Sequence, residues 1–310
     1  MPNSFSYDVS LVTWNSEKWL KDCLQSIFNQ TQKPGKIFIT DNASNDKTLE
    51  ILGNYPELEL TKSSENSGYA KAHNLNINKS QSDFILVINP DIILSNDYVE
   101  VLLNFAGKDQ KISALVGEIK HFQNKAIDTC GLQIKPWRLV KEIKKEFNEP
   151  EEVFGISGAI ALYRKTALEN IQIQGQLFDE SFFAYKEDVQ LAWRLRWAGW
   201  HAFCVPQAKA NHVRSVRDDT PRRNRDFLRR KLSYRNHWLL YATSENSKTV
   251  LPDLWVIVPA EIFRFLYLLI IDAKMAMSAL AEVKKMWHSA RTFAKQEKRL
   301  LKASELRSKF

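Results

Sequence analysis

Apolar residues in the first 120 positions follow two spacings that alternate along the chain. Short apolar or β-prone runs predict strands at residues 9–13, 36–40, 58–61 and 84–88. Helical spacing between these runs predicts helices at residues 19–28, from about 46, and from the loop at 66–68 through 77. We expect Ser16 to cap the first of these helices and Ser44 or Asn45 the second. The repeated order predicts an α/β fold with a mostly parallel sheet flanked by helices.

The residues that follow the predicted strands are the first candidates for a functional site. Ligands of open α/β sheets bind beyond the carboxyl ends of the strands. Small polar or acidic residues stand there, namely Trp14 with Asn15, residues 41–44 and residues 89–91. The pattern is what a site for a polar ligand requires.

Asp91, just past the most apolar strand, is the candidate ligand for a divalent cation. Carboxylate oxygens suit Mg²⁺ or Mn²⁺, either of which would neutralise a diphosphate. Late in the chain, His212 offers an imidazole that could complete such a site. The alternatives stay open, since residues 89–91 can simply form a turn and a single histidine is often structural.

Two further carboxylates have functional and structural interpretations. Asp41 could accept the imide N–H of a uracil or thymine ring, or its loop could serve only to cap the next helix. Asp188 follows Glu187 at the start of a predicted helix, where the dipole favours a charged carboxylate and hence a general base. Acidic residues are also common in the first turn of helices that have no catalytic role. Here they follow the aromatic residues Phe178, Phe182, Phe183 and Tyr185.

The chain changes character after residue 213. Arginines crowd residues 214–235, and residues 254–281 are strongly apolar but interrupted by charges. The interruptions favour a helix that lies on a membrane surface or packs on the body over one that spans the bilayer. We therefore predict a catalytic domain at 1–213 and a basic, apolar helical extension at 214–310. The net charge of +8 fits an anionic partner such as lipid phosphate.

Composition and cysteine content narrow the kinds of protein that this chain can be. A chain of 310 residues that is 44% hydrophobic can bury a large core. Three scattered cysteines argue against a disulfide framework or a zinc site, and no secretory signal is recognisable, so we expect a cytoplasmic location. No phosphate loop of the P-loop or dinucleotide type occurs.

Six motifs arrive in an order that resembles the family 2 glycosyltransferases of the GT-A fold, and within them the bacterial rhamnosyltransferase branch. The segments that carry the resemblance are residues 9–15, 40–46, 65–74, 88–91, 155–159 and 178–188, followed by His212. Residues 88–91 correspond to the branch's form of the Asp-x-Asp metal motif, with Asn89 in place of the first acid. Lys186 and Gln190 also depart from the branch, which more often has an aromatic residue and an acid there.

The resemblance implies a role for each matched residue. Asp188 would be the catalytic base of an inverting displacement, and Asp91 with His212 would bind Mg²⁺ or Mn²⁺. The nucleotide sugar would be bound by Thr13, Trp14, Asn15, Asp41, Ser44, Asn66, Gly68, Lys71, Asn89 and Asp91. The acceptor side would comprise Gly158, Phe182, Tyr185 and Glu187.

The resemblance also implies the partners. The donor would be dTDP-L-rhamnose, with a UDP-sugar as the alternative, and the acceptor a polyprenyl-diphosphate-linked saccharide or a growing surface polysaccharide. An enzyme with such an acceptor would associate peripherally with the inner face of the plasma membrane. No nucleic-acid partner is expected, and a homodimer contact through the apolar tail stays open. The rival classes are a sugar-phosphate nucleotidyltransferase, which usually opens with a glycine-rich loop that residues 12–17 lack, and a non-catalytic membrane- or nucleic-acid-binding protein.

Overall fold

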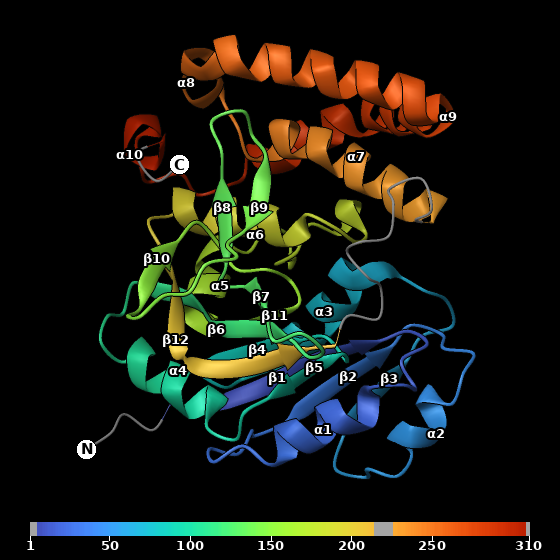
Figure 1. The fold of residues 1–310 in the computed structure, drawn as a ribbon, viewed down its shortest axis with the longest axis vertical. Helices are drawn as coiled ribbons and strands as arrows, with labels where there is room; N and C mark the ends of the chain where they lie inside the picture. The colour runs from blue at the N-terminus through green and yellow to red at the C-terminus, as the bar shows by residue number, and fades with distance from the viewer. Residues whose placement is uncertain (1–4, 214–225, 308–310) are drawn as a thin grey trace.

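A computed structural model describes residues 5–213 and 226–307 of the chain. Its centre is a ten-stranded sheet with the order β10-β12-β6-β11-β4-β1-β2-β3, to which β5 and β7 add at β12 and β6 (Figure 1). The strands are β1 (Tyr7–Thr13), β2 (Ile37–Asp41), β3 (Glu59–Lys62), β4 (Phe84–Ile88), β5 (Ile92–Leu94), β6 (Ile112–His121), β7 (Ile127–Thr129), β10 (Glu151–Val153), β11 (Ile160–Arg164) and β12 (His201–His212). A separate hairpin pairs β8 (Leu132–Ile134) with β9 (Val140–Glu142).

The predicted parallel arrangement holds for the first four strands of the chain. β1 pairs in parallel with both β2 and β4, and β2 with β3. Beyond β4 the sheet is mixed, because β11 runs antiparallel between β4 and β6 while β12 runs parallel to β6. All five residues of β4 are buried, as expected for a strand with neighbours on both edges and helices on both faces. β11 pairs with β4 and β6, which lie far before it in the chain, and the apolar pattern of a strand does not show its direction.

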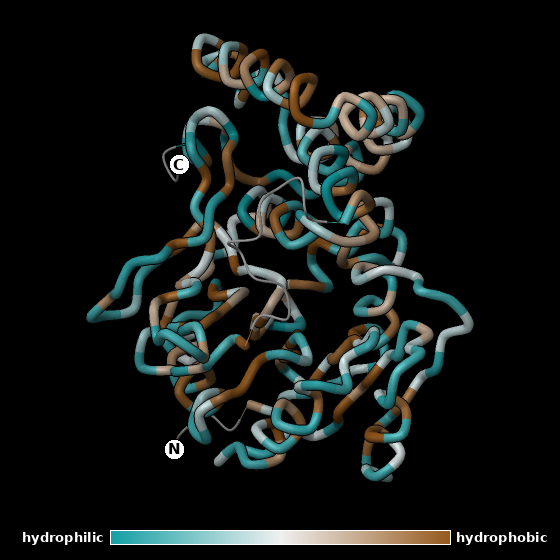
Figure 2. Tube along the Cα trace, turned by 45° about the vertical axis from the view of Figure 1, so that its right-hand side comes forward, coloured by the Kyte–Doolittle hydropathy of each residue, from teal (hydrophilic) through white to brown (hydrophobic). Residues whose placement is uncertain are grey.

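Helices cover both faces of the sheet. α1 (Leu20–Phe28) and α4 (Tyr98–Ala106) lie on one face, and α3 (Gly68–Lys79), α5 (Lys165–Ile171) and α6 (Glu187–Trp197) on the other (Figure 1). The short α2 (Thr48–Leu52) follows β2. Figure 2 shows that the apolar segments of this part of the chain concentrate in the strands at its centre.

The predicted helix caps are wrong. α1 begins at Leu20 after Trp19, and Ser16 instead accepts a hydrogen bond from the Trp14 N–H through its Oγ at 3.1 Å. α2 begins at Thr48, and Ser44 bonds to Asp41 rather than to the helix. The polar side chains of these loops therefore form hydrogen bonds that hold the loops after β1 and β2 in place.

The C-terminal helices share a core with α6. They are α7 (Phe227–Thr243), α8 (Ser247–Val250), α9 (Leu254–Ala294) and α10 (Ala303–Arg307), with a 3₁₀ turn η3 (Leu251–Asp253) before α9. Leu239 and Leu240 of α7 and Leu306 of α10 pack in one apolar cluster with Trp193 and Trp197 of α6. The arginine-rich residues Arg214, Arg217, Arg222, Arg223 and Arg225 lie outside the described residues.

The side chains of α9 show which part of this apolar helix packs on the protein and which part is exposed. Among the described residues, Ser247–Ala294 is the one helical stretch long and apolar enough to cross a membrane. The helix is interrupted at Asp272, where the backbone leaves helical geometry. Before that kink the large side chains of Trp255, Phe263 and Ile270 are 78%, 73% and 84% exposed, whereas Met275, Ala276 and Ala279 after it are buried against Tyr234 of α7.

Candidate active site

The Asp41 carboxylate is held in a fixed position by hydrogen bonds from residues at the ends of β1 and β2. Asp41 is buried, and its Oδ1 accepts from the hydroxyls of Thr13 at 2.8 Å and Ser44 at 2.6 Å. Its Oδ2 accepts from the Ser44 N–H at 3.0 Å. The N–H of Asn15, whose φ is 51°, donates to the Ser44 Oγ at 2.9 Å. The structure thus brings together these predicted nucleotide-side residues, with Trp14 exposed beside them.

The loop before α3 closes on this region through backbone contacts. Asn66 accepts from the Gly68 N–H through Oδ1 at 2.9 Å, and Asn42 donates from Nδ2 to the Gly68 carbonyl at 3.1 Å. Gly68 has φ +86°, and a Cβ there would stand 2.6 Å from the carbonyl oxygen of Phe183. Glycine is therefore required both for the backbone and for the space. Lys71 lies exposed in the first turn of the helix.

Asp91 and His212 meet because of strand pairing. β5 pairs antiparallel with β12, opposing His212 to Ile92, and the Val213 N–H donates to the Asp91 carbonyl at 2.8 Å. The His212 Nε2 lies 3.4 Å from Asp91 Oδ2. Asn89, two residues earlier, donates its backbone N–H to the Ala159 carbonyl at 2.9 Å, which ties the end of β4 to the segment that carries Gly158.

A buried carboxylate that sequence analysis missed stands behind His212. Asp128 Oδ2 lies 2.7 Å from His212 Nδ1, and its Oδ1 lies 3.2 Å from His121 Nε2. Asp128 belongs to the three-residue strand β7, and a lone acid in so short a strand gives no sequence signal. Burial lowers the pKa of His212, but the hydrogen bonds to Asp128 and Asp91 and their charges outweigh it and raise that pKa to about 9.

Asp91 and His212 fit a divalent cation whose other ligands include the diphosphate of a bound nucleotide. A carboxylate oxygen and an imidazole nitrogen converge, and the second imidazole nitrogen is held by a carboxylate, as is usual for metal-ligating histidines. Across the described parts of the chain, no three His, Cys, Asp or Glu side chains gather in a way that would hold a metal ion. The remaining coordination positions would then fall to diphosphate oxygens and water, the usual arrangement for Mg²⁺ with phosphates.

Asp188 lies at the first turn of α6, held by backbone donors. Its Oδ2 accepts from the Gly158 N–H at 2.8 Å and its Oδ1 from the Val189 N–H at 2.7 Å. Burial raises the pKa of Asp188, against the lowering effect of these N–H groups. The dipole of α6 therefore does not leave Asp188 with the low pKa that its helix position suggested.

The neighbouring Glu187 is the more strongly perturbed acid. Burial, and then the charge of Asp188, raise the pKa of Glu187 well above its usual range. Two neighbouring carboxyl groups cannot both be charged at low cost, and the stronger upward pKa shift at Glu187 favours a shared proton on that residue. Charge separation of this kind suits a general base at position 188.

Donor-side and acceptor-side elements touch directly. The Tyr69 hydroxyl of α3 donates to the Gly158 carbonyl at 2.6 Å, and a Cβ on Gly158 would stand 3.2 Å from that hydroxyl and 3.5 Å from Asp188 Oδ2. Gly158 thus leaves room between the two elements. Tyr185 is exposed beside them, whereas Phe182 is fully buried in the α6–α7 core. Burial of its ring leaves the predicted acceptor-side role of Phe182 without support in the structure.

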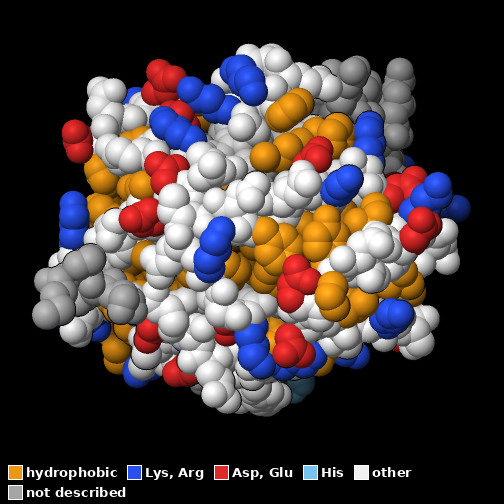
Figure 3. All heavy atoms as spheres, turned by 90° about the horizontal axis from the view of Figure 1, so that it is seen from below, with side chains coloured by type: hydrophobic (Ala, Val, Ile, Leu, Met, Phe, Trp, Pro, Cys, Tyr) orange, Lys and Arg blue, Asp and Glu red, His pale blue; other side chains and the backbone are white. Residues whose placement is uncertain are grey.

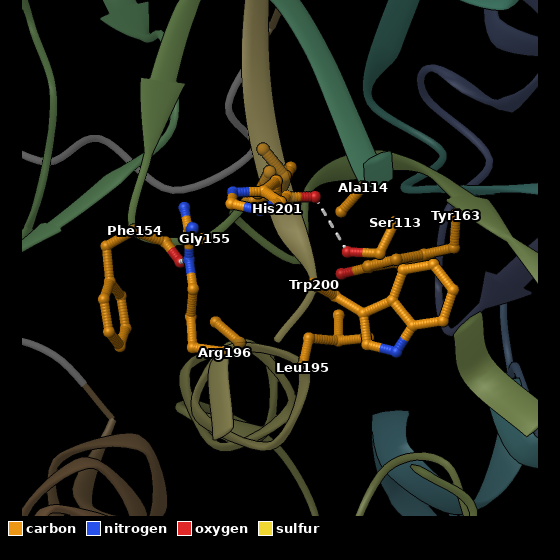
Figure 4. A pocket seen from close by; sticks show the side chains of 12 residues that line it. Ser113, Ala114, Phe154, Gly155, Tyr163, Leu195, Arg196, Trp200 and His201 are labelled. Atoms are coloured by element: carbon orange, nitrogen blue, oxygen red, sulfur yellow. Dashed lines mark hydrogen bonds between the residues drawn. The ribbon is translucent and has the colours of Figure 1, made fainter. Parts of the chain in front are cut away.

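A small cavity lies away from these groups. It measures about 10 Å³, roughly the room of one water molecule, and is lined by residues of β6, β11, β12, α6 and the loop after β10, among them Ser113, Arg196 and Gly155 (Figure 4). The Ser113 hydroxyl donates across it to the His201 carbonyl at 2.9 Å. Its lining residues are not those at the strand ends, so it has no part in the candidate site.

Comparison with known proteins identifies the family. The sequence profile described as "Glycosyl transferase family 2" matches residues 8–172, and the chain belongs to this family. It is therefore a glycosyltransferase with the GT-A fold. A relative from Mycobacterium tuberculosis, "N-acetylglucosaminyl-diphospho-decaprenol L-rhamnosyltransferase", is 28% identical over 236 residues, which are 66% of this chain and 75% of the relative.

More distant relatives share the fold. "Poly-beta-1,6-N-acetyl-D-glucosamine synthase" of Staphylococcus aureus is 24% identical over 64% of this chain, which spans 47% of that relative. The structure of GalNAc-T7 with UDP, GalNAc and Mn²⁺ aligns with TM-score 0.64 and 14% identity over 80% of this chain and half of that one. S. aureus TarS 1–349 in complex with UDP-GlcNAc aligns with TM-score 0.58 and 15% identity over 93% of this chain and 88% of that one.

Proposed function

We propose that the protein transfers a sugar from a nucleotide sugar to a lipid-linked or polysaccharide acceptor by a single inverting displacement. The observation that carries the proposal is Asp188, a half-buried carboxylate fixed by two backbone N–H groups beside the buried side chain of Glu187. Its raised pKa brings it nearer the operating pH, where a general base is most effective. Asp188 takes the proton from the acceptor hydroxyl as that oxygen attacks the anomeric carbon.

The strand ends supply the donor site in this proposal. Asp41, supported by Thr13 and Ser44, accepts the imide N–H of the base, with Trp14 and Asn15 beside the base and ribose. Asn66, Gly68 and Lys71 lie on the diphosphate or donor-sugar side, at the start of α3, with Asn89 at the end of β4.

Asp91 and His212 are the residues that would hold a divalent cation, Mg²⁺ or Mn²⁺. When bound, the cation neutralises charge on the departing nucleoside diphosphate. Asp128 keeps His212 turned with Nε2 toward Asp91, so the histidine needs no reorientation when a ligand arrives.

Similarity suggests the substrates. The mycobacterial relative's name describes rhamnosyl transfer to N-acetylglucosaminyl-diphospho-decaprenol, which favours dTDP-L-rhamnose as donor and a polyprenyl diphosphate saccharide as acceptor. The TarS complex contains UDP-GlcNAc, so a UDP-sugar is the alternative donor. On the acceptor side, Gly158 leaves space beside Asp188, the buried Glu187 influences the charge of Asp188, and the Tyr185 side chain is exposed to solvent.

The exposed face of α9 supports peripheral attachment to the cytoplasmic face of the membrane. Trp255, Phe263 and Ile270 are largely exposed on the first half of the helix. α9 itself lies at the periphery of the molecule (Figure 1). At the opposite end of the molecule, acidic and basic side chains are interspersed among the apolar ones (Figure 3). In this proposal residues 1–213 perform catalysis, and residues 214–310 bring the enzyme to its lipid-linked acceptor.

Vesicle flotation tests the attachment. Wild type should float with phosphatidylglycerol vesicles at low salt, and the triple variant Trp255→Ser, Phe263→Ser, Ile270→Ser should remain with the soluble fraction. Phe122→Ser removes an exposed aromatic residue far along the chain from α9 and should float like wild type. Equal flotation of wild type and the triple variant, or no flotation of either, would refute the attachment; a dimer that the triple variant dissociates would assign the face to a second copy.

A transfer assay tests the function. The full chain, with Mn²⁺ or Mg²⁺, is incubated with a synthetic polyprenyl-diphosphate N-acetylglucosamine and either dTDP-rhamnose or UDP-sugars, and product lipid is detected by mass spectrometry. We expect a product one sugar heavier, with inverted anomeric configuration. No product with any donor, from folded protein that also fails to bind nucleotide, would contradict the proposal.

A further inference from the structure

The loop that leads to Asp188 has an unusual backbone. Phe183 has φ 63° and ψ −66°, and the Ala184 N–H donates to the Phe182 carbonyl at 2.7 Å, which is a γ-turn of the rare, strained form. Tyr185 and Lys186 follow with φ 72° and 69°. Such conformations persist only where surrounding structure holds them, and they cluster at functional sites.

α7 holds this turn with side chains. The Asn236 amide nitrogen lies 2.9 Å from the carbonyl oxygens of Phe182 and Ala184, and 2.6 Å from that of Tyr185. The Arg235 Nη2 donates to the carbonyls of Ser181 and Phe182, each at 2.9 Å. Arg235 Nε also donates to Asn236 Oδ1 at 2.9 Å, and this contact fixes which way the amide points.

The same turn contacts the donor-side helix. The Phe183 carbonyl accepts from the Ala70 N–H of α3 at 3.1 Å, and the Phe183 side chain lies where a Cβ on Gly68 would need to be. The turn therefore lies between α7 and α3, and five residues beyond it the chain reaches Asp188. Displacement of the turn would alter the acceptor side without touching Asp41 or Asp91.

α7 is itself anchored to α9 by ion pairs to Glu282 and by a hydrogen bond between Glu261 and His237, whose pKa burial lowers to about 4. Lys231 Nζ and Arg235 Nη1 lie 2.6 Å and 3.2 Å from the carboxylate oxygens of Glu282, and His237 Nε2 lies 2.8 Å from Glu261 Oε1. Asn236, between Arg235 and His237, is fully buried. The helix that the sequence assigns to the extension thus reaches the acceptor-side loop of the catalytic part.

We infer that Asn236 is a positioning residue: it holds the strained turn at Phe183, and through it the placement of Asp188 toward the acceptor. The inference rests on the proposed role of Asp188 as base. Asn236 touches no reacting atom in this account. It acts by satisfying carbonyls that the strained backbone leaves pointing at α7, since an unsatisfied buried carbonyl is costly.

The test uses the full chain with Asn236→Asp, which keeps the shape but loses N–H donors. Arg235→Lys is a milder second variant, in which the cation remains near Glu282. Asn76→Asp is the matched control, because Asn76 is an equally buried asparagine whose amide donates to the carbonyls of Leu11 and Phe38 instead. Hydrogen exchange of residues 179–190, turnover, and nucleotide affinity are measured for each.

We expect exchange in residues 182–189 to quicken about tenfold or more in Asn236→Asp, and turnover to fall about tenfold to a hundredfold, as for a modest misplacement of a reacting group. Nucleotide affinity should fall much less than turnover, because the turn contacts Gly68 and Ala70 at the start of α3 but Asp41 and Asp91 lie on other elements. Arg235→Lys should give the same pattern in weaker form, and Asn76→Asp should leave exchange in this loop unchanged. A general loss of stability would lower turnover and nucleotide affinity together, rather than lowering turnover much more than affinity.

The inference would be overturned if the loop in Asn236→Asp exchanged hydrogen at the wild-type rate. It would also be overturned if the loop exchanged faster while turnover and acceptor KM stayed unchanged. If wild type transfers no sugar at all, the proposed function fails separately, and the exchange data alone decide whether Asn236 holds the loop.

Discussion

Nδ1 of His212 lies 2.7 Å from Oδ2 of Asp128, and the opposite ring nitrogen faces Asp91. The two partners enter from different strands, β7 and β12, which both pair with β6. Because the pKa of His212 is raised to about 9, a cation at Nε2 would displace a proton from the ring, while Nδ1 would go on donating its proton to Asp128.

Asp128→Asn should weaken Mn²⁺ binding about tenfold to a hundredfold, the usual effect of losing the carboxylate behind a ligating histidine. Titration calorimetry with Mn²⁺ in the presence of dTDP measures it. His121→Gln alters only the contact with the other oxygen of Asp128 and should cost less. Folded Asp128→Asn that binds Mn²⁺ as tightly as wild type would remove Asp128 from the account.

Asp188→Asn should lower kcat by about 10²- to 10⁴-fold, the usual range for loss of a general base. Glu187→Gln should cost much less, because burial raises the pKa of Glu187 well above its usual range and so favours the protonated form that glutamine mimics. For wild type, kcat/KM should rise with pH as Asp188 loses its proton, and its raised pKa places that rise at higher pH than for a free aspartate. Equal losses in the two variants would contradict the division of charge between them.

The sequence predicted the strand ends well because their signals are local. β4 begins and ends at the residues expected from its unbroken apolar run, and Asp41, Asp91 and Asp188 all follow or begin predicted elements. Asp128, Tyr69 and Asn236 were missed because each acts through partners distant in the chain. Asn236, for example, binds carbonyls more than 50 residues earlier. The sequence could not show that the ring of Phe182 is buried, because an aromatic residue beside a catalytic loop gives the same pattern whether it faces a ligand or a core.

Gly68→Ala should destabilise the protein and reduce activity, because its φ is positive and a Cβ would collide with the Phe183 carbonyl. Gly175→Ala is the matched control, since Gly175 also has positive φ but would place its Cβ in open space. The control should cost about 1–2 kcal/mol for the backbone conformation alone, and Gly68→Ala should cost more. Equal shifts of Tm in thermal unfolding would show that the contact with Phe183 is unimportant.

Glu297 predicts a pH dependence of stability. Burial raises its pKa to about 7, against the charges of Arg299 and Arg194, so the folded state holds a proton that the unfolded chain releases near pH 4.5. This group's contribution to stability is therefore fully present below about pH 4.5 and declines as pH rises to about 7, at no more than about 1.4 kcal/mol per pH unit.

Glu297→Gln should abolish that decline. Urea unfolding of wild type and variant at pH 5 and pH 7 measures it as a difference, which cancels the titration of the histidines. The variant should gain stability relative to wild type between the two pH values. A relative loss over this interval would show that Glu297 is charged in the folded state at pH 5.

The central claim is a metal-dependent nucleotide-sugar site at Asp91, and nucleotide binding tests it most directly. Calorimetry of dTDP, UDP and GDP, each with and without Mn²⁺, is compared between wild type and Asp91→Ala. We predict that dTDP or UDP binds wild type more tightly with Mn²⁺ and that Asp91→Ala loses this gain. Folded wild-type protein that binds none of the three nucleotides under either condition would contradict the account.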